Sequence, residues 1–337
     1  MRFGPVPLHV AEGAILAHSV QLAKGRLRKG RVLSGDDIAT LAANGLTRVT
    51  VAQLDPGDIE ENEAARRLAA ALVPNPDAAG LELQEAFTGR VNIRATRAGV
   101  VEIDVAAVEA LNAVDPMITL ATVPRWQRAW PGMMVGTVKI IAYGVENNAL
   151  CRAEDAARSA ISIRPVEVQS AGLIVTEVPG DPVHPDDKGI RSVTGRLEAL
   201  GISLDALRIV AHDSEAIRAA LADLPGALKL ILTASATSDI HDVAPSAVVA
   251  AGGQITRFGM PVDPGNLLFL GQIGPAPVIG LPGCARSPAL NGADWVLERV
   301  ACGVPVSAAD ISAMGVGGLL KEIPTRPQPR AGRNPNG

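Results

Sequence analysis

The sequence predicts an α/β protein, in which a three-layer α/β/α domain with a mostly parallel sheet follows a smaller α+β region. From residue 166 onward, short apolar segments alternate with amphipathic segments of helical period, and short loops join them. Right-handed parallel crossovers produce this pattern. Hydrophobic residues make up 47% of the 337-residue chain and aromatic residues only 2%, so the cores must consist mainly of Ala, Val, Leu and Ile. A chain of this length can bury two such cores.

Three regions are expected along the chain. The α+β region covers residues 1–160, the α/β/α domain covers residues 166–322, and a tail rich in Pro and Arg covers residues 323–337. We place a hinge at residues 147–161, where an Asn pair and a charged helix at 152–160 interrupt the pattern. The composition of the tail is typical of a linker or a disordered segment.

In the α+β region, capping residues and apolar periodicity predict a series of elements. They are a turn-rich strand pair at 25–33, a helix from Ser34 to Asn44, a strand at 48–52, helices at 58–72 and 105–112, and strands at 117–123 and 133–143. Arg90, Arg94 and Arg97 could bind phosphates through their planar donors, or they form the solvated face of a strand. Trp126 and Trp130 indicate either a contact surface or the cover of a small core.

The charge balance and the cysteines argue against several classes of function. The formal net charge is −4 and the pI is about 5.8, so no basic surface for nucleic acid is expected. Cys151, Cys284 and Cys302 lack metal-ligand spacing and do not suggest a disulfide framework. No run of about 18 apolar residues predicts a membrane span, and the N-terminal residues lack the apolar core of a signal peptide. We therefore expect a cytoplasmic protein.

The stretch from residue 228 to residue 251 determines the functional interpretation. Leu228–Leu232 has the pattern of a strand buried on both faces, and Pro245 opens a helix at 246–251. Between them lie Thr233, Ala234, Ser235, Ala236, Thr237, Ser238, Asp239 and Asp242. A strand that runs through a small-residue loop into a helix builds anion sites in open α/β sheets, because the loop admits a ligand and the helix N-terminus offers N–H groups.

This loop resembles the Thr-Gly-Gly-Thr-Gly loop, with its following acid and proline, of the molybdopterin-binding domain. That domain is shared by molybdopterin adenylyltransferases, molybdopterin molybdenumtransferases and gephyrin-type proteins. The matching residues are Thr233, Asp242, Val243 and Pro245. The glycine positions hold Ala234, Ser235 and Thr237. Because glycine permits positive φ and close ligand approach, we expect this loop to follow a relaxed path that no longer needs glycine.

Four further segments resemble the family. Residues 25–52 are weakly similar to the segment that leads into the catalytic domain of molybdenumtransferases. Asp213 matches an acid that handles the pterin or its nucleotide, although a helix cap would explain it equally well. Where molybdenumtransferases carry lysines, this chain has Val262, Asp263 and Asn266, and Gly265 of the same segment is a further candidate for ligand binding. The last segment matches a strand-end loop whose N–H groups can cradle a phosphate, and it consists of Gly280, Leu281, Pro282, Gly283, Cys284 and Arg286.

The resemblance implies a site for a pterin phosphate, in which acids hold the pterin and backbone N–H groups and Arg286 hold the phosphate. Asp213 and Asp242 would be the catalytic acids if the protein is an enzyme. Mg²⁺ with a nucleotide could bind through Asp242, since magnesium prefers carboxylate oxygens. The other residues named in these segments would bind the ligand.

The resemblance leaves three functions open. The first is a protein that binds molybdopterin or the molybdenum cofactor in biosynthesis or handover, with little adenylyltransferase activity. The tail favours this function, because the chain resembles proteins fused to a molybdenum cofactor cytidylyltransferase-like domain. The others are an active adenylyl- or molybdenumtransferase-like enzyme, and a non-catalytic scaffold that keeps the fold. We expect a homo-oligomer whose partner is a nucleotidyltransferase domain or a molybdoenzyme maturation protein, with no nucleic acid and no membrane.

Overall fold

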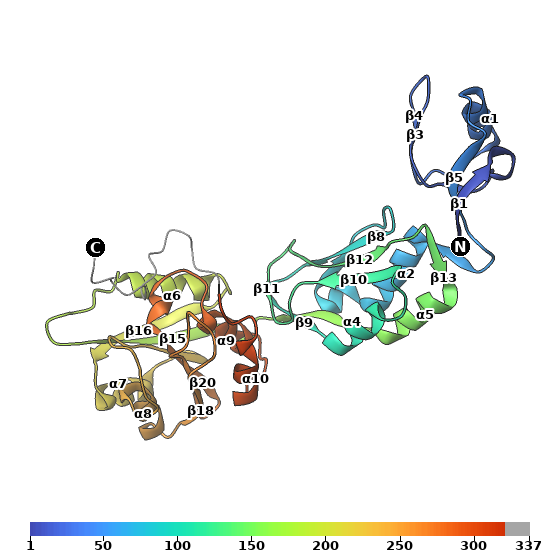
Figure 1. Cartoon of the computed structure of the whole chain (residues 1–337). Helices are drawn as coiled ribbons and strands as arrows, with labels where there is room; N and C mark the ends of the chain where they lie inside the picture. Colours follow the sequence, from blue (N-terminus) through green and yellow to red (C-terminus); the bar gives the residue numbers. More distant parts are fainter. Residues whose placement is uncertain (321–337) are drawn as a thin grey trace, which may run out of the picture. The chain divides into compact units, whose positions relative to one another are not determined.

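The structure is a computed structural model that describes residues 1–320 (Figure 1). The chain divides into two compact units, Met1–Pro165 and a second unit that begins at Val166. The tail predicted for residues 323–337 lies outside the described residues. None of the helices within residues 1–320 is long and apolar enough to cross a bilayer.

The first 53 residues build a small α+β part with its own core. Its elements are β1 (Arg2–Pro7), β2 (Ile15–Leu16), β3 (Val20–Gln21), β4 (Arg26–Leu27), α1 (Gly35–Ala43) and β5 (Arg48–Gln53). β5 pairs antiparallel with β1 and β2, and Leu16, Leu41 and Val51 belong to the core. The strand pair predicted at 25–33 is found instead as the hairpin β3–β4, because the chain turns at Leu22–Gly25.

Residues 54–165 form antiparallel sheets covered by helices. The elements are β6 (Asp58–Glu60), α2 (Glu61–Leu72), α3 (Pro76–Ala79), β7 (Leu81–Leu83), β8 (Arg90–Ala95), β9 (Gly99–Ile103), α4 (Val105–Asn112), β10 (Ile118–Thr122), β11 (Arg128–Ala129), β12 (Met134–Ile140), β13 (Gly144–Glu146), α5 (Asn147–Ala156) and β14 (Ile161–Pro165). The sheets have the orders β10-β12-β8-β7, β11-β9-β14 and β13-β6. Leu68 and Leu72 of α2 share one core with Ile93 and Ile140 of the largest sheet.

Two helices of this part begin at other residues than predicted. The helix predicted at 58–72 begins at Glu61, because its first three predicted residues pair with β13 as strand β6. The helix predicted at 152–160 runs over Asn147–Ala156 instead. Alanine and leucine side chains of its first turns are buried, so the predicted Asn pair starts a packed helix.

The three arginines of the β8 region bind protein groups. Arg97 Nη2 donates to the carbonyl oxygens of Ala78 and Ile163 at 2.8 and 3.0 Å. Arg90 donates to the Thr137 hydroxyl of β12, and Arg94 donates to the Gly132 carbonyl in the turn before β12. These bonds favour a structural role on the strand over a phosphate site.

The two tryptophans of the loop before β12 differ in exposure. Trp130 is 52% exposed, whereas Trp126 is half-buried and lies under the guanidinium of Arg125, 4.6 Å from the ring centroid. Such a cation–π contact is worth about 0.5–1 kcal/mol at an exposed site. Trp126 thus covers part of its own loop, and Trp130 supplies exposed aromatic surface.

The second unit is built on one six-stranded, mostly parallel sheet, as predicted. Its elements are β15 (Ser170–Glu177), α6 (Lys188–Glu198), β16 (Ser203–Ala211), α7 (Ser214–Asp223), β17 (Leu228–Leu232), α8 (Val243–Ala250), β18 (Gln254–Phe258), β19 (Phe269–Ile273), β20 (Ala276–Leu281), α9 (Gly292–Ala301) and α10 (Ala308–Ser312). The strand order is β16-β15-β17-β20-β19-β18. The first four of these strands are parallel, and β19 is antiparallel to both of its neighbours.

Alternating strand residues place helices on both faces of this sheet. Leu173 and Val175 of β15 share a core with apolar residues of α6 and α9. Ile174, between them, shares the opposite core with residues of α7 and α8. Figure 1 shows α6 on one side of the sheet and α7 and α8 on the other. The predicted three-layer architecture is therefore confirmed.

The helix after the β17 loop begins earlier than predicted. It starts at Val243 and not at residue 246, because Asp242 is its N-cap and accepts the Val243 N–H at 2.8 Å. Pro245 therefore lies inside the first turn, where its missing N–H costs no helical hydrogen bond.

We expect Asp37→Asn to destabilise the N-terminal part by about 1 kcal/mol near pH 7. The Asp37 carboxylate accepts from Arg31 Nε at 2.8 Å and from the Ser34 N–H at 3.1 Å. The bond from Arg31 is the main cause that holds the pKa of Asp37 below its ordinary value of 3.8. Since the folded pKa is the lower one, this stabilisation is present above pH 3.8 and is lost as the pH falls through the folded pKa.

Urea unfolding followed through NMR signals of α1 would measure this difference at neutral and at acidic pH. Asp36→Asn, at the exposed neighbouring position, is the matched control and should change little. A destabilisation by Asp37→Asn that is equally large in acid would contradict the role of the carboxylate charge.

Candidate functional site

The carboxyl ends of four parallel strands meet at one edge of the six-stranded sheet. The register pairs Glu177 with Ala211 and Leu232 with Leu281, so the loops after β15, β16, β17 and β20 begin side by side. The β18–β19 loop emerges at the same edge, because β19 is antiparallel to β20. We name this region the carboxyl edge, and it comprises residues 178–187, 212–213, 233–242, 259–268 and 282–291. Open α/β sheets bind their ligands at this edge.

The loop after β17 closes through its own hydrogen bonds. Thr233 Oγ1 donates to the Ser235 carbonyl at 2.6 Å and lies 3.3 Å from Thr237 Oγ1, and both threonines are buried. The Ala234 N–H donates to Thr176 Oγ1 of β15 at 2.7 Å. Within residues 1–320, the non-glycine residues with positive φ all lie outside this loop. The expected relaxed path, which needs no glycine, is therefore confirmed.

Both predicted catalytic acids cap helices at the carboxyl edge. Asp213 Oδ1 accepts two N–H groups of the first turn of α7 at 3.0 and 2.9 Å. Asp242 accepts the N–H groups of Val243 and Ser238, at 2.8 and 3.0 Å. Ser214 Oγ donates to the Val243 carbonyl at 3.1 Å, so the starts of α7 and α8 are adjacent. Asp213 and Asp242 therefore lie near each other, and each carboxylate already accepts hydrogen bonds from backbone N–H groups.

Arg286 connects three loops of the carboxyl edge. Its Nη2 donates to the Thr233 carbonyl at 2.9 Å, and its Nη1 lies 3.4 Å from Asp187 Oδ1. A Cβ at Gly189, in the first turn of α6, would lie 2.9 Å from Nη1, so glycine permits this close approach. The Arg286 side chain is 31% exposed, and its guanidinium can therefore reach a ligand at the edge.

Arg196, which was not among the residues predicted for the site, fixes the loop after β20. Its side chain is 9% exposed, and Nε donates to Asp294 Oδ1 at 2.6 Å. Its other nitrogens donate to the carbonyl oxygens of Ser192, Ala285, Ser287 and Ala289. One signal was available, because Arg196 follows Val193 by three residues and so lies close to the apolar face of α6.

Gly280 and Leu281, predicted to bind ligand, are strand residues. Both are buried in β20 and pair with β17. A Cβ on Gly280 would lie 1.9 Å from the ring of Phe269, so this glycine serves core packing. The phosphate cradle expected here can therefore begin only at Pro282 and Gly283. Cys284, which follows, is half-buried.

The segment with Asp263, Gly265 and Asn266 is anchored by backbone hydrogen bonds to residues 318–320 and to the start of α9. The backbone of Asp263 exchanges hydrogen bonds with residues 318–320, and the Gly292 N–H donates to the carbonyl of the following proline at 2.8 Å. The side chains of Asp263 and Asn266 are exposed. They remain candidates for ligand contacts, whereas the buried Gly265 belongs to the packing against α9.

The Mg²⁺ ion predicted at Asp242 would have few ligands from the protein. Within residues 1–320, no three His, Cys, Asp or Glu side chains gather as a metal site. A magnesium ion on Asp242 would therefore depend on water and on the phosphates of a nucleotide for its other ligands.

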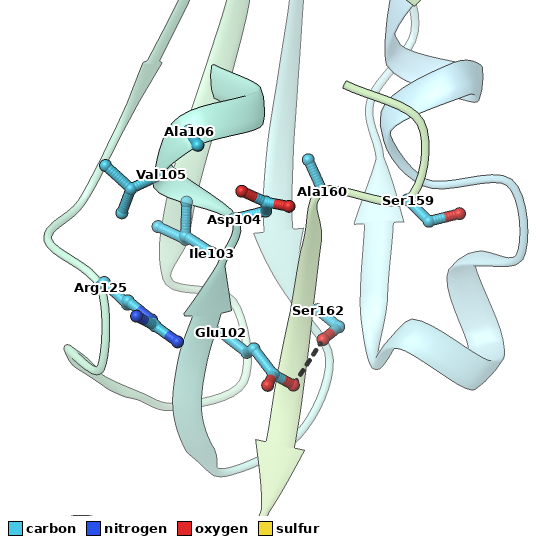
Figure 2. Close-up of a pocket in the computed structure, with 9 residues that line it drawn as sticks. All are labelled: Glu102, Ile103, Asp104, Val105, Ala106, Arg125, Ser159, Ala160 and Ser162. Carbon is cyan, nitrogen blue, oxygen red and sulfur yellow. Dashed lines mark hydrogen bonds between the residues drawn. The ribbon is translucent and has the colours of Figure 1, made fainter. Parts of the chain in front are cut away.

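A cavity of about 540 Å³ lies in the first unit, at the start of α4 (Figure 2). It is lined by Glu102, Ile103, Asp104, Val105, Ala106, Arg125, Ser159, Ala160 and Ser162. Ser162 Oγ donates to Glu102 Oε2 at 3.5 Å, and Asp104 caps α4. Arg125 stacks on Trp126. Since its charged groups already bind within the protein, the candidate site remains the carboxyl edge.

The comparisons with known proteins give a family match and several similar structures. A family model described as a domain of unknown function (DUF8806) matches residues 5–53. No curated protein matches the chain. The molybdopterin biosynthesis MoeA protein from Pyrococcus horikosii is 14% identical, with 92% of this chain and 75% of that chain covered and a TM-score of 0.30.

A second similar structure is that of molybdenum cofactor biosynthesis protein B. It is 19% identical, and the match covers 40% of this chain and 94% of that chain at a TM-score of 0.29. A molybdenum cofactor biosynthesis protein from Pyrococcus furiosus is 13% identical, with 93% and 65% covered and a TM-score of 0.24. At these TM-scores the similarities do not identify a ligand.

Replacing Arg196 with Met is expected to destabilise the second unit by about 3–5 kcal/mol, because it leaves the buried Asp294 carboxylate without its cation. Arg191→Met, at an exposed position of the same helix, is the matched control and should cost less than about 1 kcal/mol. Urea unfolding of the full chain measures both. Equal destabilisation by the two variants would show that Arg196 does not hold the loop after β20.

Replacing Ala234 or Ser235 with glycine is expected to destabilise the protein by about 0.4–1 kcal/mol, because glycine only loosens a chain that already has negative φ. Thr237→Gly should cost more, because it also removes a buried hydroxyl that lies 3.3 Å from Thr233 Oγ1. Thermal unfolding of each single variant measures this effect. A glycine variant that is more stable than the wild type would indicate backbone strain at that residue and would contradict the relaxed path.

Proposed function

We propose that this chain binds molybdopterin or the molybdenum cofactor at the carboxyl edge, in biosynthesis or handover of the cofactor. The observation that supports this proposal is the junction at Arg286, which joins the family-like loop after β17 to the loops after β15 and β20. A partly exposed guanidinium beside a hydroxyl-rich loop suits a phosphate, since bidentate guanidinium–phosphate pairs are strong and directional.

The exposed groups around this junction suit the pterin. The amino-pyrimidinone edge of a pterin requires hydrogen-bond acceptors for its N–H groups and donors for its carbonyl. Ser235, Ser238 and Asp239 are exposed on the loop after β17, and Asp213 adds a carboxylate on the neighbouring loop. These groups would hold the ring while Arg286 holds the phosphate.

We propose that adenylyltransferase activity is low. Nucleotidyl transfer needs groups that stabilise the charge of the transferring phosphate. In this loop the N–H groups of Ala234 and Ser238 are engaged by Thr176 and Asp242, and the lysine positions of molybdenumtransferases hold Asp263 and its neighbours. A carrier keeps its ligand without this stabilisation. The active-enzyme alternative is therefore less well supported.

A non-catalytic scaffold is the second candidate, and the closed loop after β17 favours it. A loop whose polar groups bind one another keeps its shape without any ligand.

In the carrier role, we expect a homo-oligomer in the cytoplasm that delivers the cofactor to a nucleotidyltransferase domain or to a molybdoenzyme maturation protein.

Cofactor retention separates these functions. The full chain would be purified from a molybdenum-competent host, and any bound pterin would be oxidised to its fluorescent derivative and quantified. Retained pterin supports the carrier, and its absence favours the scaffold. Incubation with molybdopterin and Mg²⁺-ATP then tests catalysis, and robust adenylylation would overturn the proposal of low activity.

Arg286→Gln is expected to weaken molybdopterin binding about tenfold or more, because it removes a charge-assisted bond to the phosphate. Arg191→Gln, which removes an exposed cation of α6, is the control and should bind like the wild type. Fluorescence titration of each purified protein measures the affinity, and thermal unfolding checks that the fold is kept. Equal affinity of the two variants would remove Arg286 from the phosphate site.

A further inference from the structure

His212 is held at the carboxyl edge by two hydrogen bonds. Its backbone N–H donates to the Glu177 carbonyl at 2.9 Å and continues the ladder between β15 and β16. Its ring nitrogen Nδ1 lies 2.9 Å from Thr176 Oγ1. The imidazole is half-buried, and with Nδ1 engaged, Nε2 is the nitrogen left for a ligand.

Thr176 determines which nitrogen of His212 carries the proton. The threonine is fully buried, and its hydroxyl oxygen already accepts the Ala234 N–H at 2.7 Å. Its hydroxyl hydrogen can therefore go to His212 Nδ1. If Nδ1 carried the proton instead, the Thr176 hydroxyl hydrogen would have no acceptor on the ring. A buried hydroxyl without an acceptor costs free energy. Of the two tautomers of the neutral ring, this hydrogen-bond chain favours the one with the proton on Nε2.

We infer that His212 determines ligand specificity at the carboxyl edge, where Thr176 fixes its ring as an Nε2–H donor toward a neutral acceptor of the ligand. This inference rests on the proposed function for the identity of the ligand, a pterin, whose ring carbonyl and ring nitrogens are such acceptors. His212 would donate to the pterin ring, and Arg286 would bind the phosphate. A fixed donor of this kind discriminates against rings that lack the acceptor.

Thr176 ties this donor to the loop after β17. The same hydroxyl contacts His212 after β16 and Ala234 after β17, so one side chain of β15 orients groups from both neighbouring strands. Thr176 is thus a positioning residue, and His212 is the residue that would touch the ligand.

The first test needs no ligand. Long-range ¹H–¹⁵N NMR correlations distinguish the two neutral imidazole tautomers, and the chain has five histidines, so the signals that vanish in His212→Gln identify His212. At mildly alkaline pH the wild type should show the Nε2–H tautomer. Thr176→Val should lose this preference, and Thr176→Ser, which retains the hydroxyl, should keep it. A proton on Nδ1 in the wild type would overturn the inference.

The second test uses neopterin, a pterin without phosphate, so that binding through Arg286 does not contribute. His212→Leu should weaken neopterin binding by about 2- to 10-fold, and His212→Gln, whose amide can donate from a similar position, should recover part of the loss. Inorganic phosphate is the control ligand, and its affinity should not respond to either variant.

The outcomes separate this inference from the proposed function. Wild-type binding of neopterin with no change in His212→Leu would overturn the role of His212 and leave the proposed function standing. A wild type with the Nε2–H tautomer that binds neither neopterin nor molybdopterin would overturn the proposed ligand, and with it the pterin specificity assigned to His212. The tautomer fixed by Thr176 would still stand.

Discussion

The structure of the carboxyl edge depends on one buried cation, Arg196. A guanidinium away from water is tolerated only when its N–H groups find acceptors, and here Asp294 and four backbone carbonyls provide them. Because three of those carbonyls belong to residues 285–289, the charge forces this loop into one path. That path places Arg286 against the Thr233 carbonyl, and the loop after β17 is thereby fixed as well.

The fold of the second unit could be predicted from the sequence because its pattern is regular. Apolar strands such as Leu228–Leu232, separated by capped helices, permit few alternatives to a parallel sheet with helices on both faces. The first unit has a weaker pattern, since strands of two or three residues leave little periodicity. For this reason the sequence does not distinguish β6 from the start of α2, or the first turn of α5 from a hinge.

The candidate site could be predicted only where local sequence carries the signal. Asp213 and Asp242 stand before helices, so their places at the carboxyl edge followed from the chain order. Gly280 looked like part of a phosphate loop, but the ring of Phe269, from a neighbouring strand, decides its role. The partners of Arg196 lie 89 to 98 residues away, apart from one within its own helix. The local sequence places Arg196 near the apolar face of α6, but it does not identify partners this far along the chain.

The hydrogen bonds of the loop after β17 have opposite consequences for the proposed binding and for catalysis. The side chains of Ala234, Ser235 and Thr237 reduce the freedom of the unfolded chain, and internal hydrogen bonds hold the loop in shape before any ligand binds. A ligand that binds to this loop therefore orders little of the protein. The same bonds withdraw the N–H groups of Ala234 and Ser238 from a transferring phosphate. A preorganised loop of this kind suits a protein that holds its ligand intact and hands it on.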